Sequence, residues 1–249
     1  RIGCFDDISA VEHDDYSSVS VNLVSPSGIS EFTDSKCLIK GRGNATWEFD
    51  GYSPKKKPYE IRFEKKHGIG GLSPRKKWVL LANAYEGTGI LNKMVLDTAK
   101  EMGMKYVTDS EWADVYADGN YLGNYLICSE VQDSAAHITD AGGYIIEKND
   151  VYFENKRYGF KTANDGFTIK APGVIDDEEV GGLQRLADTV DEDMRLSKPE
   201  LNHIDADSFA KWYILEELFY NEDALITSCF FYTGSDMSKL YAGPPWDFG

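Results

Sequence analysis

The first 130 residues are divided into short runs of alternating apolar and polar side chains, and this periodicity limits the fold more than any other feature. Residues 59–64 alternate Tyr, Ile and Phe with charged residues, the pattern of a strand with one buried face. Residues 19–24 alternate similarly and are followed by a turn at 26–28. Residues 78–82 form a continuous apolar run, typical of a strand covered on both faces. We therefore expect a strand-rich first region.

A helix and a hairpin are also predicted in this region. Apolar residues recur at helical spacing from Ile90 to Met102, and Gly103 stands where a C-terminal cap is expected. Farther along, the apolar runs 112–116 and 121–128 flank an Asp-Gly pair at 118–119, which favours a tight hairpin.

Beyond residue 130 the pattern mixes strands with helices. Residues 142–147 and 167–170 are predicted strands. Acidic residues at 176–179 favour the start of a helix that we expect to end near residue 195. Residues 230–233 and 239–241 predict a second hairpin.

A further helix is predicted over residues 208–220, with Asp207 as its cap. Its spacing predicts one buried face. That face is expected to hold Phe209, Trp212, Leu215, Leu218 and Phe219.

These elements predict an α+β chain of two lobes. A strand-rich N-lobe with one helix is expected over residues 1–130, and a mixed helical and strand C-lobe over residues 131–249. A cleft between two such lobes is a natural place for a nucleotide.

Charge narrows the classes of partner. Asp and Glu number 42 against 26 Lys and Arg, and the formal net charge of -16 disfavours nucleic acid or an anionic membrane as the main partner. A basic protein or a metal-bound anion fits better. No stretch approaches the roughly 20 apolar residues of a membrane-spanning helix, so none is expected.

The four cysteines, Cys4, Cys37, Cys128 and Cys229, lack the spacing of metal ligands. Cys4 and Cys37 could pair across early strands, or the cysteines could be buried free thiols. The sequence leaves both alternatives open.

Two carboxylates stand late in the chain, far from its cationic stretches. Asp223 follows a predicted helix directly, and Asp247 lies between Trp246 and Phe248. Phosphoryl transfer requires metal-bound phosphate oxygens and an aspartate that orients the nucleophilic hydroxyl. Because Mg²⁺ prefers hard oxygen donors, Asp247 is the candidate metal ligand.

The candidate phosphate-binding turn is a glycine-rich segment at the end of an early strand. It consists of Gly41, Arg42, Gly43 and Asn44, whose backbone amides and polar side chains could approach an anion. A bare Gly-x-Gly pair is more often an ordinary turn, and that interpretation stays open.

Six motifs stand in order along most of the chain: Gly41–Trp47, Lys56–Tyr59, Lys77–Asn83, Tyr121–Tyr125, Gly142–Tyr144 and Pro245–Phe248. Together they resemble the spore-coat CotH kinase family. The sequence Tyr-Ala-Gly-Pro at 241–244 looks like CotH-type modules of secreted bacterial proteins.

The resemblance implies an atypical protein-kinase-like fold that uses ATP and Mg²⁺ or Mn²⁺ to phosphorylate serine. The acceptors in such a family are often coat or surface proteins, and often the kinase itself. The implied location is therefore extracellular, on the cell surface or in a spore coat. The chain's net charge favours a basic acceptor.

The resemblance also implies roles for residues of the second lobe. Asp223 aligns with the aspartate of the family's Asn-x-Asp and is expected to orient the substrate hydroxyl. Ser228 stands where kinase-type loops commonly place a metal-binding asparagine. The family usually has an acidic residue after Asp-Phe, where this chain has Gly249, so we expect further sequence beyond this position.

In the first lobe, Lys57 precedes a strand at the place where protein-kinase-like folds keep their phosphate-contacting lysine. Lys56 and Arg62 are the alternatives, and the whole run could instead be a solvated cationic surface. Glu130 could contact the base or ribose of the nucleotide, or pair with a surface lysine.

Two other classes of function stay open. One is a non-catalytic CotH-like scaffold for assembly of a coat or extracellular complex, to which Ser228 and Gly249 point. The other is carbohydrate hydrolysis by Asp223 and Asp247 as an acid and base pair. That reading leaves the upstream lysines and glycines without a purpose.

Overall fold

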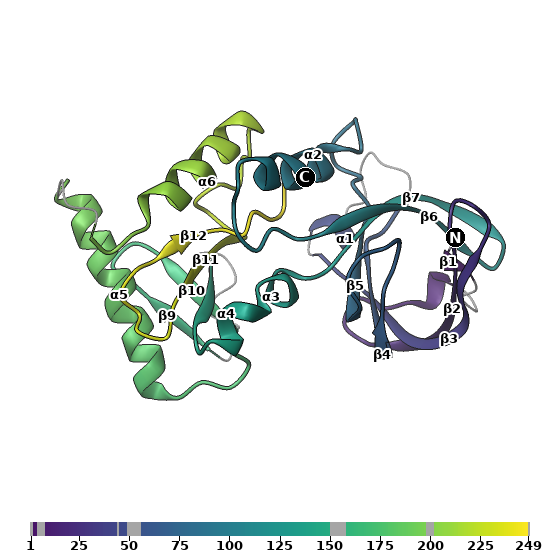
Figure 1. The fold of residues 1–249 in the computed structure, drawn as a ribbon, viewed down its shortest axis with the longest axis horizontal. Helices are drawn as coiled ribbons and strands as arrows, with labels where there is room; N and C mark the ends of the chain where they lie inside the picture. Colours follow the sequence, from purple (N-terminus) through teal and green to yellow (C-terminus); the bar gives the residue numbers. More distant parts are fainter. Residues whose placement is uncertain are drawn as a thin grey trace. The chain divides into compact units, whose positions relative to one another are not determined.

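The computed structural model describes residues 2–3, 8–43, 45–48, 56–149, 158–197 and 202–248. Three residues named above, Cys4, Asn44 and Gly249, lie outside these ranges. The chain divides into two compact units (Figure 1). The first comprises Arg1–Lys93 and Thr108–Glu130, and the second comprises Met94–Val107 and Val131–Phe248.

Within the described residues of the first unit, seven strands close into a barrel in the order β1-β2-β3-β4-β5-β7-β6 (Figure 1). Neighbouring strands are antiparallel, except that β1 lies parallel to β6 with Ile2 opposite Val115. The strands are β1 (Ile2–Gly3), β2 (Ser17–Val24), β3 (Ser30–Gly41), β4 (Tyr59–His67), β5 (Arg75–Leu81), β6 (Ser110–Ala117) and β7 (Asn120–Cys128). The short helices η1 (Ile8–Ala10) and α1 (Ala45–Glu48) complete this part.

Strand β4 confirms the predicted alternation. Its Tyr59, Ile61 and Phe63 are buried in the barrel core, whereas Arg62 is exposed. Glu60 is the exception, because it lies on the polar side of the strand and is only 5% exposed.

The predicted hairpin and the first helix are also confirmed. β6 and β7 are joined through Asp118 and Gly119, which both have positive φ, as a two-residue hairpin turn requires. Helix α2 (Leu91–Glu101) ends before Gly103, whose φ is 71°. The Met104 N–H then donates to the Ala99 carbonyl, which closes the helix end.

In the second unit, the described residues form a five-stranded antiparallel sheet in the order β12-β11-β8-β10-β9. Helices cover it, and all are drawn in Figure 1. The strands are β8 (Tyr144–Lys148), β9 (Gly159–Lys161), β10 (Gly166–Ala171), β11 (Cys229–Thr233) and β12 (Tyr241–Ala242). The helices are α3 (Val131–Ser134), α4 (Ala136–Asp140), α5 (Asp177–Arg195) and α6 (Ala206–Leu218).

The two faces of this sheet are covered by different helices. Tyr144 and Ile146 of β8 share a core with residues of α5 and α6. Ile145, which points to the opposite face, packs with Phe230 and with residues of α3 and α4. Both faces are therefore buried, so these strands have nearly continuous apolar sequences.

The two long helices are capped by aspartates. At α5 the Asp176 side chain accepts from the Glu179 N–H while the Glu179 carboxylate accepts from the Asp176 N–H, a capping box. At α6 the cap is Asp205, which accepts from the Ser208 N–H. The prediction of Asp207 as the cap was therefore wrong by two residues.

The buried face of α6 also differs from the prediction. Trp212 and Leu215 are buried as expected, but Leu218 is 63% exposed. Glu216 is buried instead, one helical turn after Trp212. The α6 helix is consequently apolar on its exposed side and carries an acid on its buried side.

The predicted fold class, α+β with a two-lobed protein-kinase-like fold and a mixed helical C-lobe, is wrong. The first unit is a closed barrel, and the second is organised around a five-stranded sheet, so that strands dominate the described residues. Strand β9 has three residues, too few for alternation to be visible in sequence. The centre of the second sheet is built by the pairing of β8 with β10 and β11.

Cys37, Cys128 and Cys229 are buried free thiols, and burial raises the pKa of each to about 12. Cys4, the other half of the pairing considered above, is outside the described ranges. In the part of the chain that is described, no helix combines the length and the apolar character needed to span a bilayer.

Candidate functional site

The glycine-rich turn is tightly packed. Gly41 ends β3, and a Cβ atom there would come within 2.5 Å of the Trp47 ring. Gly43 has a φ of 76°, a conformation that favours glycine. The Gly41 N–H donates to the Glu12 carbonyl at 2.7 Å, and the Arg42 N–H donates to Pro58 at 3.3 Å. These two amides are therefore engaged within the protein.

The two candidate lysines have different surroundings. Lys56 donates to the carbonyl oxygens of Ala82, at 2.6 Å, and Asn124, and burial lowers its pKa. Lys57 instead holds its ammonium group 4.2 Å from the centroid of the Trp47 ring. Its cation thus lies beside the residue that packs on Gly41. This placement favours Lys57 over Lys56 as a phosphate ligand, which stays a prediction.

A network of charged residues links strands β4 and β5 of the barrel to Glu130. Lys77 of β5 lies 3.3 Å from Glu60 and 3.1 Å from Glu130, and Tyr16 donates to Glu60. Burial opposes the charge of Lys77, but the charges of Glu130 and Glu60 raise its pKa above the ordinary value. Glu130 therefore has the lysine partner that was one of its two predicted roles, whereas contact with a nucleotide stays a prediction.

The sequence interpretation missed Lys77 as a member of this network. Lys77 was noted only within a basic run and a motif, while Arg62, which lies opposite it on β4, is exposed. The signal in the sequence is an acidic residue, Glu60, on one predicted strand and a basic residue, Lys77, at the start of the next.

Asp223 lies in a loop that follows α6 and is fixed at its start. The Asn221 amide donates to the Glu216 carboxylate at 2.7 Å, and its oxygen accepts from the Asp223 N–H at 3.1 Å. The Asn221 N–H also donates to the Glu216 carbonyl. Asn221 thus links the buried end of α6 to the backbone of Asp223, whose own side chain is exposed.

Glu216 is an unusual anchor because it is buried. Burial raises its pKa to about 7, and the hydrogen bond from Asn221 opposes this rise. Among the described residues, no lysine or arginine forms an ion pair with it. The sequence interpretation missed this residue, although its position four residues after Trp212 placed it on the buried face.

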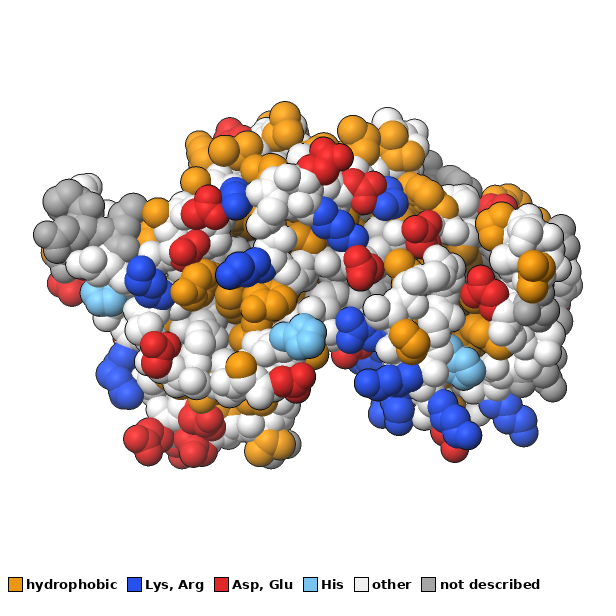
Figure 2. Space-filling model, in the orientation of Figure 1, with side chains coloured by type: hydrophobic (Ala, Val, Ile, Leu, Met, Phe, Trp, Pro, Cys, Tyr) orange, Lys and Arg blue, Asp and Glu red, His pale blue; other side chains and the backbone are white. Residues whose placement is uncertain are grey.

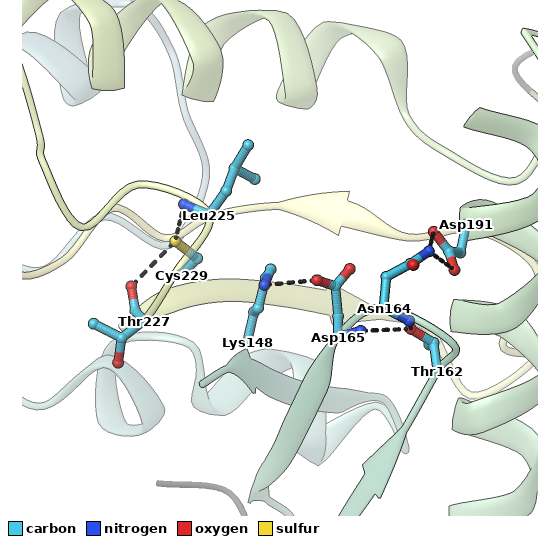
Figure 3. A network of polar contacts seen from close by, with 8 residues as sticks. All are labelled: Lys148, Thr162, Asn164, Asp165, Asp191, Leu225, Thr227 and Cys229. Atoms are coloured by element: carbon cyan, nitrogen blue, oxygen red, sulfur yellow. Dashed lines mark hydrogen bonds and ion pairs between the residues drawn. The ribbon is translucent and has the colours of Figure 1, made fainter. Parts of the chain in front are cut away.

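The end of the same loop is held by the sheet. The Leu225 N–H donates to the Cys229 sulfur at 3.2 Å, and the Cys229 thiol donates to the Thr227 carbonyl (Figure 3). The Thr227 hydroxyl donates to Asn149 at 3.3 Å. Contacts at both ends therefore fix the loop that carries Asp223.

A buried ion pair lies near these contacts. Lys148, at the end of β8, is 5% exposed and lies 2.7 Å from Asp165 (Figure 3). Asn164, next to Asp165, donates to Asp191 of α5 at 2.8 Å. Figure 3 shows Lys148 directed toward Asp165, in the same region as Cys229.

Asp247 and Ser228 are brought together. The Ser228 hydroxyl donates to an Asp247 carboxylate oxygen at 3.0 Å, although 19 positions separate them. Both have left-handed backbones, with φ values of 55° and 65°. Phe248 is buried and makes an edge contact with Phe219, and Trp246 packs on a core cluster.

This pair fits one side of a magnesium site. Mg²⁺ is commonly bound through one or two carboxylates, with phosphates and waters in the remaining positions. Asp247 offers a carboxylate and Ser228 a hydroxyl oxygen. In the described ranges, no group of three or more His, Cys, Asp or Glu side chains could hold a metal by itself.

The predicted residues are divided between the two units. The first unit holds Gly41, Arg42, Gly43, Lys57 and Glu130, and the second holds Asp223, Ser228 and Asp247.

Comparison with known proteins identifies the family. Residues 39–249 match the family model described as CotH kinase protein. No curated protein matches the chain. Because the family match covers most of the sequence and both units, this chain belongs to the CotH kinase family.

Proposed function

We propose that this protein is an ATP-dependent serine kinase. It would transfer the γ-phosphoryl group of ATP to serine on a secreted or surface protein, and to serines of its own. Membership of the CotH kinase family supports a kinase-like function. The observation that carries the finer proposal is the contact between Ser228 and Asp247, beside the loop that bears Asp223.

Asp223, Asp247 and Ser228 would have different roles in phosphate transfer. Asp223 is exposed on a loop fixed at both ends, so it could orient the serine hydroxyl and take its proton as the oxygen bonds to phosphorus and ADP leaves. Asp247 and Ser228 would hold Mg²⁺ or Mn²⁺. When bound, the metal and ATP supply charge neutralisation and the phosphoryl group.

Lys57 and the Arg42 guanidinium are the proposed phosphate ligands. Gly41, Gly43, Asn44 and Glu130 complete the proposed set of nucleotide-binding residues. The acceptor is proposed to be serine-containing and basic, because the chain carries a net charge of -16. We propose an extracellular, cell-surface or spore-coat location.

The test is phosphate transfer by the purified chain with ATP and Mg²⁺ or Mn²⁺, to itself and to a basic serine-rich acceptor. Asp247→Asn should lower transfer at least about a hundredfold, because it removes a charge that positions the metal. Asp188→Asn, which changes an exposed carboxylate of α5, is the matched control and should transfer normally. Equal transfer by the Asp247 variant and the control would refute the assignment.

One observation favours a second candidate, a non-catalytic scaffold. The N–H groups of Gly41 and Arg42 already donate to protein carbonyls, so the glycine-rich turn has a structural role without a nucleotide. Calorimetry with ATP and Mg²⁺ separates the two candidates. Metal-dependent nucleotide binding without any phosphate transfer would support the scaffold.

A further inference from the structure

Helix α6 presents an apolar face to solvent. Tyr213, Ile214 and Leu218 are between 51% and 63% exposed, whereas Trp212 and Leu215 are buried beneath the helix. Because successive helical residues are about 100° apart, the three exposed side chains share one face about 140° wide. Figure 2 shows hydrophobic side chains gathered over α6.

The apolar character continues into the loop that carries Asp223. Tyr220 is 80% exposed, Leu225 is 57% exposed and Ile226 is 48% exposed. Single exposed apolar residues are common, but a concentration of large ones marks an interaction site. We define the α6 surface as Tyr213, Ile214, Leu218, Tyr220, Leu225 and Ile226.

The charged residues that stand between Tyr213 and Ile226 in the sequence are all acidic. Glu217 is exposed on the same face of α6, and Glu222 and Asp223 are exposed in the loop. Lys211, the basic residue of α6, is paired with Asp207 at 2.7 Å, and the sequence contains no Lys, Arg or His from Trp212 to Ser238. A partner that covers the α6 surface must therefore supply apolar side chains and positive charge together.

We infer that the α6 surface is the docking site of the acceptor protein, which binds through a segment that combines apolar and basic side chains. The inference rests on the proposed function and deepens it, because Tyr220 and Leu225 stand on either side of Asp223 in the chain. Docking at this surface would hold an acceptor serine within reach of the Asp223 loop.

A second copy of this chain is a poorer occupant. A twofold interface places the same surface of each copy against the other, so Glu217, Glu222 and Asp223 of both copies would be brought into one interface. Each copy also carries a net charge of -16. Like-charge contact at an interface opposes association, whereas a basic segment is attracted.

Binding of two labelled peptides to the full chain tests the inference. One peptide has a serine flanked by leucines and arginines at helical spacing, and in the other the leucines are replaced by glycines. Fluorescence anisotropy should show tighter binding of the leucine peptide. The double variant Ile214→Ser, Leu218→Ser should bind it about tenfold more weakly, because exposed apolar contacts are lost.

Two further variants separate the apolar from the electrostatic contribution. Met194→Ser removes a side chain of α5 that is 53% exposed, and this control should bind the leucine peptide as the unmodified chain does. Glu217→Lys should weaken binding severalfold and should reduce its salt dependence, since it reverses a charge within the surface. Equal binding of the two peptides, or full binding by the double variant, would overturn the docking site.

The readouts keep the docking site and the kinase proposal distinct. Preferential binding of the leucine peptide without phosphate transfer would support docking and count against the kinase. Transfer with no preference for that peptide would support the kinase and refute docking. Sedimentation supplies the remaining outcome: self-association that the double variant abolishes would assign the α6 surface to a second copy and overturn the inference.

Discussion

A buried glutamate of the first unit, Glu60, and one of the second, Glu216, have opposite pKa shifts. Glu60 in the barrel is 5% exposed and Glu216 in the second unit is 6% exposed. Burial raises the pKa of Glu60, but the hydrogen bond from Tyr16 and the charge of Lys77 more than offset this, so its pKa lies below the ordinary value. Burial raises the pKa of Glu216 to about 7, with only a neutral amide in opposition. Because both side chains are buried, the groups that contact each carboxylate determine whether its pKa is lowered or raised.

The backbone conformation near each of the two glutamates also differs. Glu60 lies in a regular strand, whereas the segment beyond Glu216 contains Tyr220, Leu225 and Ser228 with positive φ. Such conformations in non-glycine residues store strain and persist where the surroundings impose them, often at functional sites. The barrel acid therefore belongs to a stabilising network, and Glu216 belongs to the support of a strained loop.

Removing the cation from the barrel network should have the largest effect on stability. Lys77→Met leaves Glu60 buried without its charge partner, and loss of one member of a buried pair costs about 3 kcal/mol at a partly exposed site. Urea unfolding at pH 7 measures this loss. Lys76→Met is the matched control, because Lys76 is exposed on the same strand and should change the unfolding free energy by less than about 0.5 kcal/mol.

Equal stability of the two lysine variants would remove the contrast between the acids. Glu60 would then be stable in its site without Lys77, and the network would not be the reason for its lowered pKa.

Glu216→Gln should have the next largest effect, and it should be stabilising at high pH. The pKa of Glu216 rises from 4.5 to about 7 on folding, so its favourable contribution is complete below pH 4.5 and is lost as pH rises toward 7. At about 1.4 kcal/mol for each pKa unit, the charged form costs on the order of 3 kcal/mol at pH 8. Gln avoids this cost and can still accept from Asn221.

Unfolding free energies of the unmodified chain and Glu216→Gln should therefore diverge between pH 4.5 and 8. Glu217→Gln, at the exposed neighbouring position, should show no such divergence. A difference that is independent of pH would mean that Glu216 titrates normally in the folded chain.

Local patterns in the sequence predicted much of the fold. The alternation of β4, the Asp-Gly turn of the β6–β7 hairpin and the apolar spacing of α2 each depend on neighbouring residues, and each is confirmed. The fold class was wrong because it depends on distant pairing. Ile2 lies beside Val115 to close the barrel, and β8 lies between β10 and β11, partners separated from each other by nearly sixty residues. No local periodicity specifies such contacts.

The candidate site was predictable to a similar degree. Asp223, Ser228 and Asp247 were found from motifs, and the structure brings Ser228 to Asp247. The residues that support the site were missed. No pattern in the sequence singles out Glu216, and Lys77 stands out only as the first residue of a motif, because acids and lysines are usually exposed. Their burial depends on the partners that folding supplies, Asn221 for one and Glu60 for the other.

Asn221→Ala should have the smallest effect on stability and the sharpest effect on the loop. It removes the donor to Glu216 and the acceptor for the Asp223 N–H, for a net loss of about 1 kcal/mol. It should also raise the pKa of Glu216 further, because the hydrogen bond from Asn221 lowers it. Hydrogen exchange at the Asp223 amide should become about fivefold faster. Asn164→Ala, which breaks an exposed amide–carboxylate contact in the same unit, should leave that amide unchanged; unchanged exchange in both variants would show that Asn221 does not hold the loop.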